Sequence, residues 1–158
     1  MDDQDRKLVG VIEQPLWVVI NVPTQVGDTG VSHAYTTGLF RNWGHPEIVV
    51  YGLENEMMRT VLNLIGEQVA SGARRFQPHI AYDNVLDGLD VIFLPVARPE
   101  TKGDFGWAIH YYQRLRSPPV AFPALQCVWP TMSGVWPWQP EWPARLAGRQ
   151  PLIGSPPG

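Results

Sequence analysis

The order of the periodic segments is the feature that most constrains the fold of this chain. Residues 54–72 repeat apolar side chains at three- and four-residue steps, which is typical of an amphipathic helix. A second helical pattern covers residues 104–116, with Asp104 as a candidate cap and prolines beyond its end. Short β-branched apolar runs surround these two segments, at residues 16–22, 33–39, 47–53, 89–96 and 124–128. Because this order lacks regular strand–helix alternation, the sequence predicts an α+β domain with a mainly antiparallel sheet and two main helices.

The first two-thirds of the chain also carries turn signals. Asn42, Gly44 and Pro46 lie between the runs 33–39 and 47–53, so we expect these runs to form a hairpin. The run 16–22 lies between two prolines and has no polar alternation, which predicts a strand buried on both faces.

Length and charge limit the classes of protein. A chain of 158 residues can bury a core without a disulfide or a structural metal. We expect one domain over residues 10–152, with a flexible N-terminus at 1–9 and a flexible tail at 153–158. The net charge of -3 and the scattered basic residues indicate no nucleic-acid partner. The start of the chain has no signal-like or membrane-spanning run and Cys127 is the single cysteine, which predicts a cytoplasmic protein without a membrane partner.

His45 and Glu47 are the strongest candidates for catalysis. Residues two apart on a strand share a face, so an imidazole and a carboxylate could act together as an acid–base pair. Tyr35 and Thr36 would lie across the hairpin from this pair and could donate hydrogen bonds. In the competing interpretation, His45 and Pro46 close the turn, and Glu47 is a solvated or capping carboxylate.

Metal and cofactor signals are missing. The four histidines, His33, His45, His79 and His110, have no metal-ligand spacing, so no metal site is predicted. Cys127 lies in an apolar run, where a lone cysteine usually packs as a small hydrophobe. No phosphate-binding glycine motif occurs and no cofactor is identified, although a flavin-type cofactor held without such a motif stays open.

The C-terminal third is rich in proline and tryptophan. Trp129, Trp136, Trp138 and Trp142 alternate with prolines that forbid regular strand pairing. The sequence therefore predicts an irregular strap over the rest of the fold. Its rings either cap the core or line a groove for a peptide or small ligand.

Two anchors, AYTTGLFRNWGHPEIVVYGL and FPALQCVWPTMSGVWPW, resemble the bacterial family catalogued as domain of unknown function 4262. Family members typically show Tyr-Thr-x-Gly-Leu, then Gly-His-Pro-Glu, and later Phe-Pro-x-Leu-Gln-x-x-Trp-Pro-Asp with a Pro-Trp shortly after. The first anchor is matched here by Tyr35, Thr36, Gly38, Leu39, Gly44, His45, Pro46 and Glu47. The second is matched by Phe122, Pro123, Leu125, Gln126, Trp129, Pro130, Pro137 and Trp138. The likeness covers about residues 10–152, and Thr131 departs from it where the family usually has an acidic residue. The resemblance implies a fold unit but no activity.

These observations lead to one main functional hypothesis and two alternatives. The main hypothesis is a binding domain that holds a protein segment or small ligand in a groove between the hairpin and the strap. The expected contacts are Tyr35, Thr36, His45, Glu47, Gln126, Trp129 and Trp138. The alternatives are a small enzyme that uses His45 as a base, Glu47 to orient it and Tyr35 or Gln126 as a donor, or a flavin-type cofactor carrier.

Overall fold

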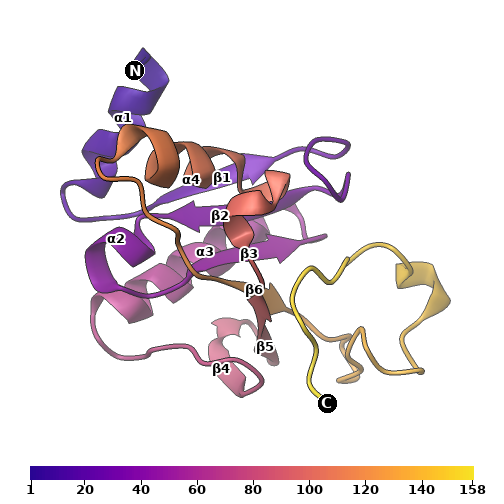
Figure 1. Cartoon of the computed structure of the whole chain (residues 1–158). Coiled ribbons are helices and arrows are strands. Elements are labelled where there is room, and N and C mark those ends of the chain that lie inside the picture. Colours follow the sequence, from indigo (N-terminus) through magenta and orange to yellow (C-terminus); the bar gives the residue numbers. More distant parts are fainter.

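A six-stranded sheet forms the centre of the protein (Figure 1), and the computed structural model describes all 158 residues. The strands lie in the order β1-β2-β3-β6-β5-β4, and every neighbouring pair is antiparallel except the parallel pair β3–β6. Their bounds are β1 Val18–Val22, β2 His33–Thr37, β3 Glu47–Tyr51, β4 Ala81–Leu86, β5 Leu89–Val96 and β6 Ala124–Val128. The predicted α+β fold with a mainly antiparallel sheet is therefore confirmed.

Helices cover both faces of the sheet and enclose two cores. Helix α3 (Asn55–Ala70) packs on one face, and its core includes Ala34, Ile48, Val50 and Cys127. Helices α1 (Asp3–Ile12) and α4 (Gly106–His110), with the π-helical turn η3 (Tyr111–Leu115), pack on the other face. The sequence generates both cores because alternate strand residues point to opposite faces. None of the helices combines the length and hydropathy that a membrane span requires.

Helix α3 confirms the long helix predicted over residues 54–72. Glu54 is its N-cap, and Gly72, just beyond the C-cap Ser71, has a φ of 77° that ends the helix. The second predicted helix is present but divided into η2 (Gly103–Phe105), α4 and η3.

The expectation that Asp104 caps this second helix is wrong. The Asp104 carboxylate points into the protein, where it accepts hydrogen bonds from the Tyr51 hydroxyl (2.7 Å) and from the Asp28 backbone N–H. The N-cap of α4 is Phe105, which makes no side-chain capping bond. Because the Asp104 carboxylate is bonded to the buried Tyr51 hydroxyl, it does not cap α4.

The connection between β2 and β3 is more than a turn. The two strands pair antiparallel with Tyr35 opposite Val49, as the hairpin prediction requires. The connection also contains the short helix α2 (Leu39–Trp43), which ends at Gly44 with a φ of 65°. This helix forms because the Glu47 carboxylate accepts backbone N–H groups at its start, which supplies the partners that a helix N-terminus lacks.

The N-terminal segment is helical, whereas a flexible terminus was expected over residues 1–9. The Asp2 side chain caps α1 by accepting the Asp5 N–H (2.7 Å). Asp5 in turn accepts the Trp107 indole N–H (2.9 Å), so α1 is fastened to α4. The sequence does not predict this contact, because its charge pattern indicates that Asp2 and Asp5 are both exposed to solvent.

Two strands differ from their expectations. β1 is an edge strand in which only Val18 is fully buried, so the prediction of a strand buried on both faces is wrong. β4 is not predicted by its mixed polar pattern, and it forms the other edge of the sheet as a hairpin with β5.

The chain after β6 is irregular, as its prolines predict, and runs beside the ends of β5 and β6 (Figure 1). We call residues 129–149 the strap, in which the one-turn helix η4 (Ala144–Leu146) is the only regular element. The following tail was expected to be flexible from residue 153, but it is bound to the sheet. The Gln126 amide donates to Pro151 O (2.7 Å) and accepts the N–H groups of Ile153 (2.9 Å) and Gly154 (3.0 Å).

Candidate functional site

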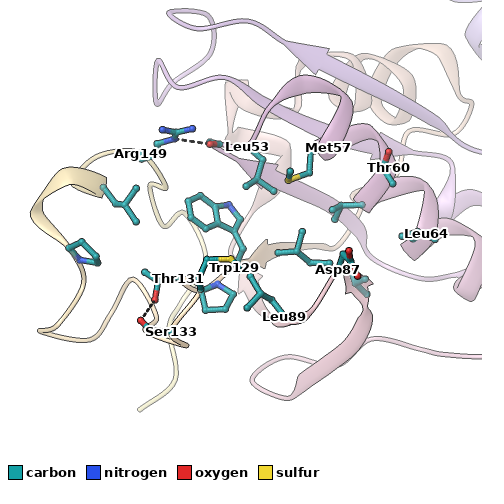
Figure 2. Close-up of a pocket in the computed structure, with 18 of the residues that line it drawn as sticks. Leu53, Met57, Thr60, Leu64, Asp87, Leu89, Trp129, Thr131, Ser133 and Arg149 are labelled. Atoms are coloured by element: carbon teal, nitrogen blue, oxygen red, sulfur yellow. Dashed lines mark hydrogen bonds between the residues drawn. The ribbon is translucent and has the colours of Figure 1, made fainter.

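A groove with a volume of about 660 Å³ lies between α3, the β4–β5 hairpin and the strap (Figure 2). The connection from β3 to α3 also contributes to its lining, through Gly52 and Leu53. The groove is lined by Gly52, Leu53, Met57, Thr60, Val61, Leu64, Val85, Leu86, Asp87, Leu89, Trp129, Pro130, Thr131, Met132, Ser133, Pro143, Arg145, Leu146 and Arg149.

Trp129 occupies the centre of this groove (Figure 2) and is held in place by its neighbours. Its indole N–H donates to Tyr51 O (2.8 Å), and its ring packs on Trp142 at a centroid distance of 5.8 Å. Its backbone N–H and C=O pair with the Gln150 side chain at 3.0 and 2.9 Å. Because ring and backbone are both fixed and only 7% of the residue is exposed, Trp129 forms a rigid floor.

The walls of the groove expose apolar side chains to solvent. Met57 is 43% exposed, Leu64 36% and Met132 88%, and these are three of the seven large apolar residues that are exposed anywhere in the chain. Burial of apolar surface is favourable by roughly 25 cal/mol per Å². A ligand that covered these three side chains would therefore gain binding free energy from the hydrophobic effect.

The charged groups of the groove lie on two different walls. Arg145 and Arg149 belong to the strap, and Asp87 belongs to the turn of the β4–β5 hairpin. The Arg149 Nε donates to Gly52 O (3.0 Å), which directs this side chain along the end of the groove. None of the three takes part in an ion pair, since the ion pairs of the protein are Arg6–Asp3, Arg74–Asp83 and His110–Asp5.

Thr131 has a clear structural role in the strap. Its hydroxyl accepts the Val135 N–H (3.0 Å) and lies 3.0 Å from the Ser133 hydroxyl, while its own N–H donates to Val135 O (2.8 Å). An aspartate at this position could accept the same N–H. Thr131 thus holds the turn with an uncharged side chain that lines the groove.

Glu47, from the first anchor, is fully buried away from the groove. Its carboxylate accepts the N–H groups of Gly38 (2.9 Å), Leu39 (3.2 Å) and Phe40 (3.2 Å), together with the hydroxyls of Thr36 (2.8 Å) and Tyr112. Burial raises the pKa of Glu47, and the hydrogen bonds, led by that from Tyr112, oppose this rise. Of the predicted site residues, the structure brings Thr36 and Glu47 together.

His45 does not pair with Glu47. The His45 ring makes two backbone hydrogen bonds, from Nδ1 to Pro46 O (2.8 Å) and to Nε2 from the Phe76 N–H (3.0 Å). Desolvation by burial lowers the pKa of His45. His45 packs against Phe76 in the α3 core, whereas Glu47 contacts Tyr112 in the α4 core. His45 precedes β3, so the alternation of strand side chains does not place it beside Glu47.

The other predicted site residues also lie apart from the groove. The Tyr35 hydroxyl accepts the Trp107 N–H (2.7 Å) in the α4 core, and burial raises the pKa of Tyr35 to about 12. Gln126 binds the tail of its own chain, on the face of β6 opposite to Trp129. Trp138 stacks on Trp136 with a centroid distance of 5.4 Å and an interplanar angle of 5°. Trp129 is thus the one predicted contact that lines the groove.

Two patterns in the sequence indicate the walls of the groove that α3 and the β4–β5 hairpin form. Met57 and Leu64 are seven residues apart, so they form a second apolar stripe on α3 beside the one that faces the core. Asp87 and Gly88 form an Asp-Gly pair directly before the apolar run of β5, and such a pair is a hairpin signal.

Metal ligands and reactive thiols do not gather in this structure. No group of three or more His, Cys, Asp or Glu side chains lies close enough to hold a metal ion. Cys127 is buried in the α3 core, and desolvation raises the pKa of its thiol.

Comparison with known proteins identifies a family but no characterised relative. The family model described as "Domain of unknown function (DUF4262)" matches residues 11–143. This match includes both anchors, all six strands and most of the strap. No curated protein and no solved structure was found to match the chain.

Proposed function

The chain belongs to the DUF4262 family, whose description states no function, and we propose that it is a binding domain for a small molecule with an apolar body. The groove between α3, the β4–β5 hairpin and the strap is the binding site. Its volume of about 660 Å³ falls within the range of roughly 300–1,000 Å³ that is common for small-molecule sites.

One observation carries this proposal: the exposed apolar side chains Met57, Leu64 and Met132 surround a floor, Trp129, that is already fixed. Because four hydrogen-bonding atoms of Trp129 and Gln150 hold the floor, little conformational entropy is lost when a ligand binds. We keep Trp129 as a ligand contact and give the predicted contacts in the hairpin, residues 35–47, a structural role.

A small ligand suits this site better than a protein segment does, because the apolar lining gathers around one fixed ring, Trp129, in a groove of about 660 Å³. An extended segment would instead need successive side-chain pockets along its length.

Binding of the neutral dye Nile red tests the proposal. We expect saturable binding with one site per chain, and loss of this site in Leu64→Asp, because a carboxylate in the wall opposes burial of the apolar dye. Ile80→Asp is the matched control, since Ile80 is 50% exposed but lies outside the groove. Equal loss in both variants, or dye binding that neither variant changes, would contradict the proposed site.

A further inference from the structure

We infer that the ligand of the groove is a monocarboxylate with an apolar chain, whose carboxylate pairs with Arg145 and Arg149. This inference rests on the proposed function and adds the chemical class of the ligand. The apolar chain lies over Trp129 toward Met57 and Leu64 on α3.

The first argument is the charge of the lining. Two guanidinium groups and one carboxylate, Arg145, Arg149 and Asp87, leave the groove with one excess positive charge. A ligand with a single negative charge neutralises this excess. A dianionic phosphate would overcompensate it, and an amine would increase it.

The second argument is that the two arginines are available. The terminal nitrogens of Arg149 make no hydrogen bond, because only its Nε is used, on Gly52 O. Arg145 makes no side-chain hydrogen bond or ion pair. The planar fork of a guanidinium matches the two oxygens of a carboxylate, and both arginines belong to the strap wall.

The third argument is the position of Asp87. Arg149 and Asp87 lie on opposite sides of Trp129 in Figure 2. Asp87 therefore repels a carboxylate from the hairpin wall and fixes the ligand with its head at the strap.

Calorimetric titration of the full chain with octanoate, 1-octanol, octylamine and octyl phosphate tests the inference. We expect octanoate to bind at least about fivefold more tightly than 1-octanol, because charge-assisted hydrogen bonds from guanidinium groups are stronger than those between neutral groups. Octylamine should bind more weakly than either of them, since it adds a positive charge.

Arg145→Gln should lower the affinity for octanoate more than the affinity for 1-octanol, and so reduce the preference for octanoate. This variant removes no hydrogen bond of the fold, and Arg114→Gln, an exposed arginine outside the groove, is its control. Arg149→Lys serves as a second variant, because lysine keeps the charge but loses the fork, and we expect a smaller loss.

The outcomes separate the two levels of the proposal. Equal binding of octanoate and 1-octanol overturns the monocarboxylate and leaves the proposed function standing. Tighter binding of octyl phosphate than of octanoate overturns it in favour of a phosphorylated ligand. If none of the four probes binds, the proposed function fails as well.

Discussion

Single residues of the first anchor explain local structure in this protein. The hydrogen bonds of Glu47 show how one buried carboxylate starts α2, and those of His45 show how one imidazole joins the β2–β3 connection to the segment at Phe76. Both residues looked like an acid–base pair because their spacing is that of a strand. The structure separates them, since the strand begins only at Glu47.

Glu47→Gln should destabilise the protein by about 2–4 kcal/mol, measured by denaturant unfolding. Each carboxylate oxygen accepts at least one backbone N–H, so the amide nitrogen of glutamine would face a donor in either orientation. Glu141→Gln, on an exposed side chain of the strap, is the control and should change the free energy of unfolding by less than about 0.5 kcal/mol. Equal effects of the two substitutions would contradict the structural role of Glu47.

His45 should make stability depend on pH. Burial lowers its folded pKa below the ordinary value of 6.5, so the unfolded chain binds a proton that the folded chain excludes as pH falls below about 6.5. The stability contributed by neutral His45 is therefore complete above pH 6.5 and is lost as pH falls toward the folded pKa.

The variant His45→Gln isolates this effect. Its free energy of unfolding should lie below that of the wild type at pH 7.5, and the difference should shrink between pH 6.5 and 5.5 because glutamine does not titrate. Denaturant unfolding at each pH measures it, with the exposed His79→Gln as control. A difference that stays constant over this range would show that His45 does not titrate as described.

At the scale of elements, close packing of α3 against the chain before β1 explains a helical glycine. A Cβ on Gly66 would lie 2.3 Å from the ring of Trp17, whose indole N–H donates to Asn63 on the same helix (3.0 Å). Gly10 in α1 has no atom within 4 Å of the corresponding position. Close packing therefore requires glycine at position 66 but not at position 10.

Alanine substitutions at these two positions should have opposite signs. Gly10→Ala should raise the free energy of unfolding by up to about 1 kcal/mol through helix propensity. Gly66→Ala gains the same propensity but forces Trp17 to move, so it should lower stability by about 1–3 kcal/mol. Thermal and denaturant unfolding compare them, and stabilisation by both would show that α3 and Trp17 are not in close contact.

The tail is the second element whose attachment can be tested. Gln126→Ala removes the hydrogen bonds to Pro151, Ile153 and Gly154, so amide exchange at Ile153 and Gly154 should accelerate. Gln77→Ala is the control, since the Gln77 side chain is exposed and unbonded. Unchanged exchange in Gln126→Ala would mean that other contacts hold the tail.

At the scale of the whole molecule, the sequence predicted the fold class correctly but predicted only one residue of the groove, Trp129. Period and turn signals identified α3 and five of the strands, because these depend on local side-chain alternation. They missed β4 because its pattern is mixed and polar, and they missed the N-terminal helix and the bound tail because these are held by distant partners, Trp107 and Gln126. The site was only partly predicted, since Trp129 and Gln126 were expected in one groove but, three residues apart, point to opposite faces of β6.

The central claim is that the groove on Trp129 binds an apolar small molecule, and methionine-methyl NMR tests it most directly. The chain has four methionines, of which Met57 and Met132 line the groove, Met58 is buried in the α3 core and Met1 lies at the opposite end of the molecule. On titration with 1-octanol, we predict saturable shifts of the Met57 and Met132 signals and unchanged signals from Met58 and Met1. Shifts of Met1 alone, or no shift of Met57 and Met132 up to the solubility limit of 1-octanol, would contradict the claim.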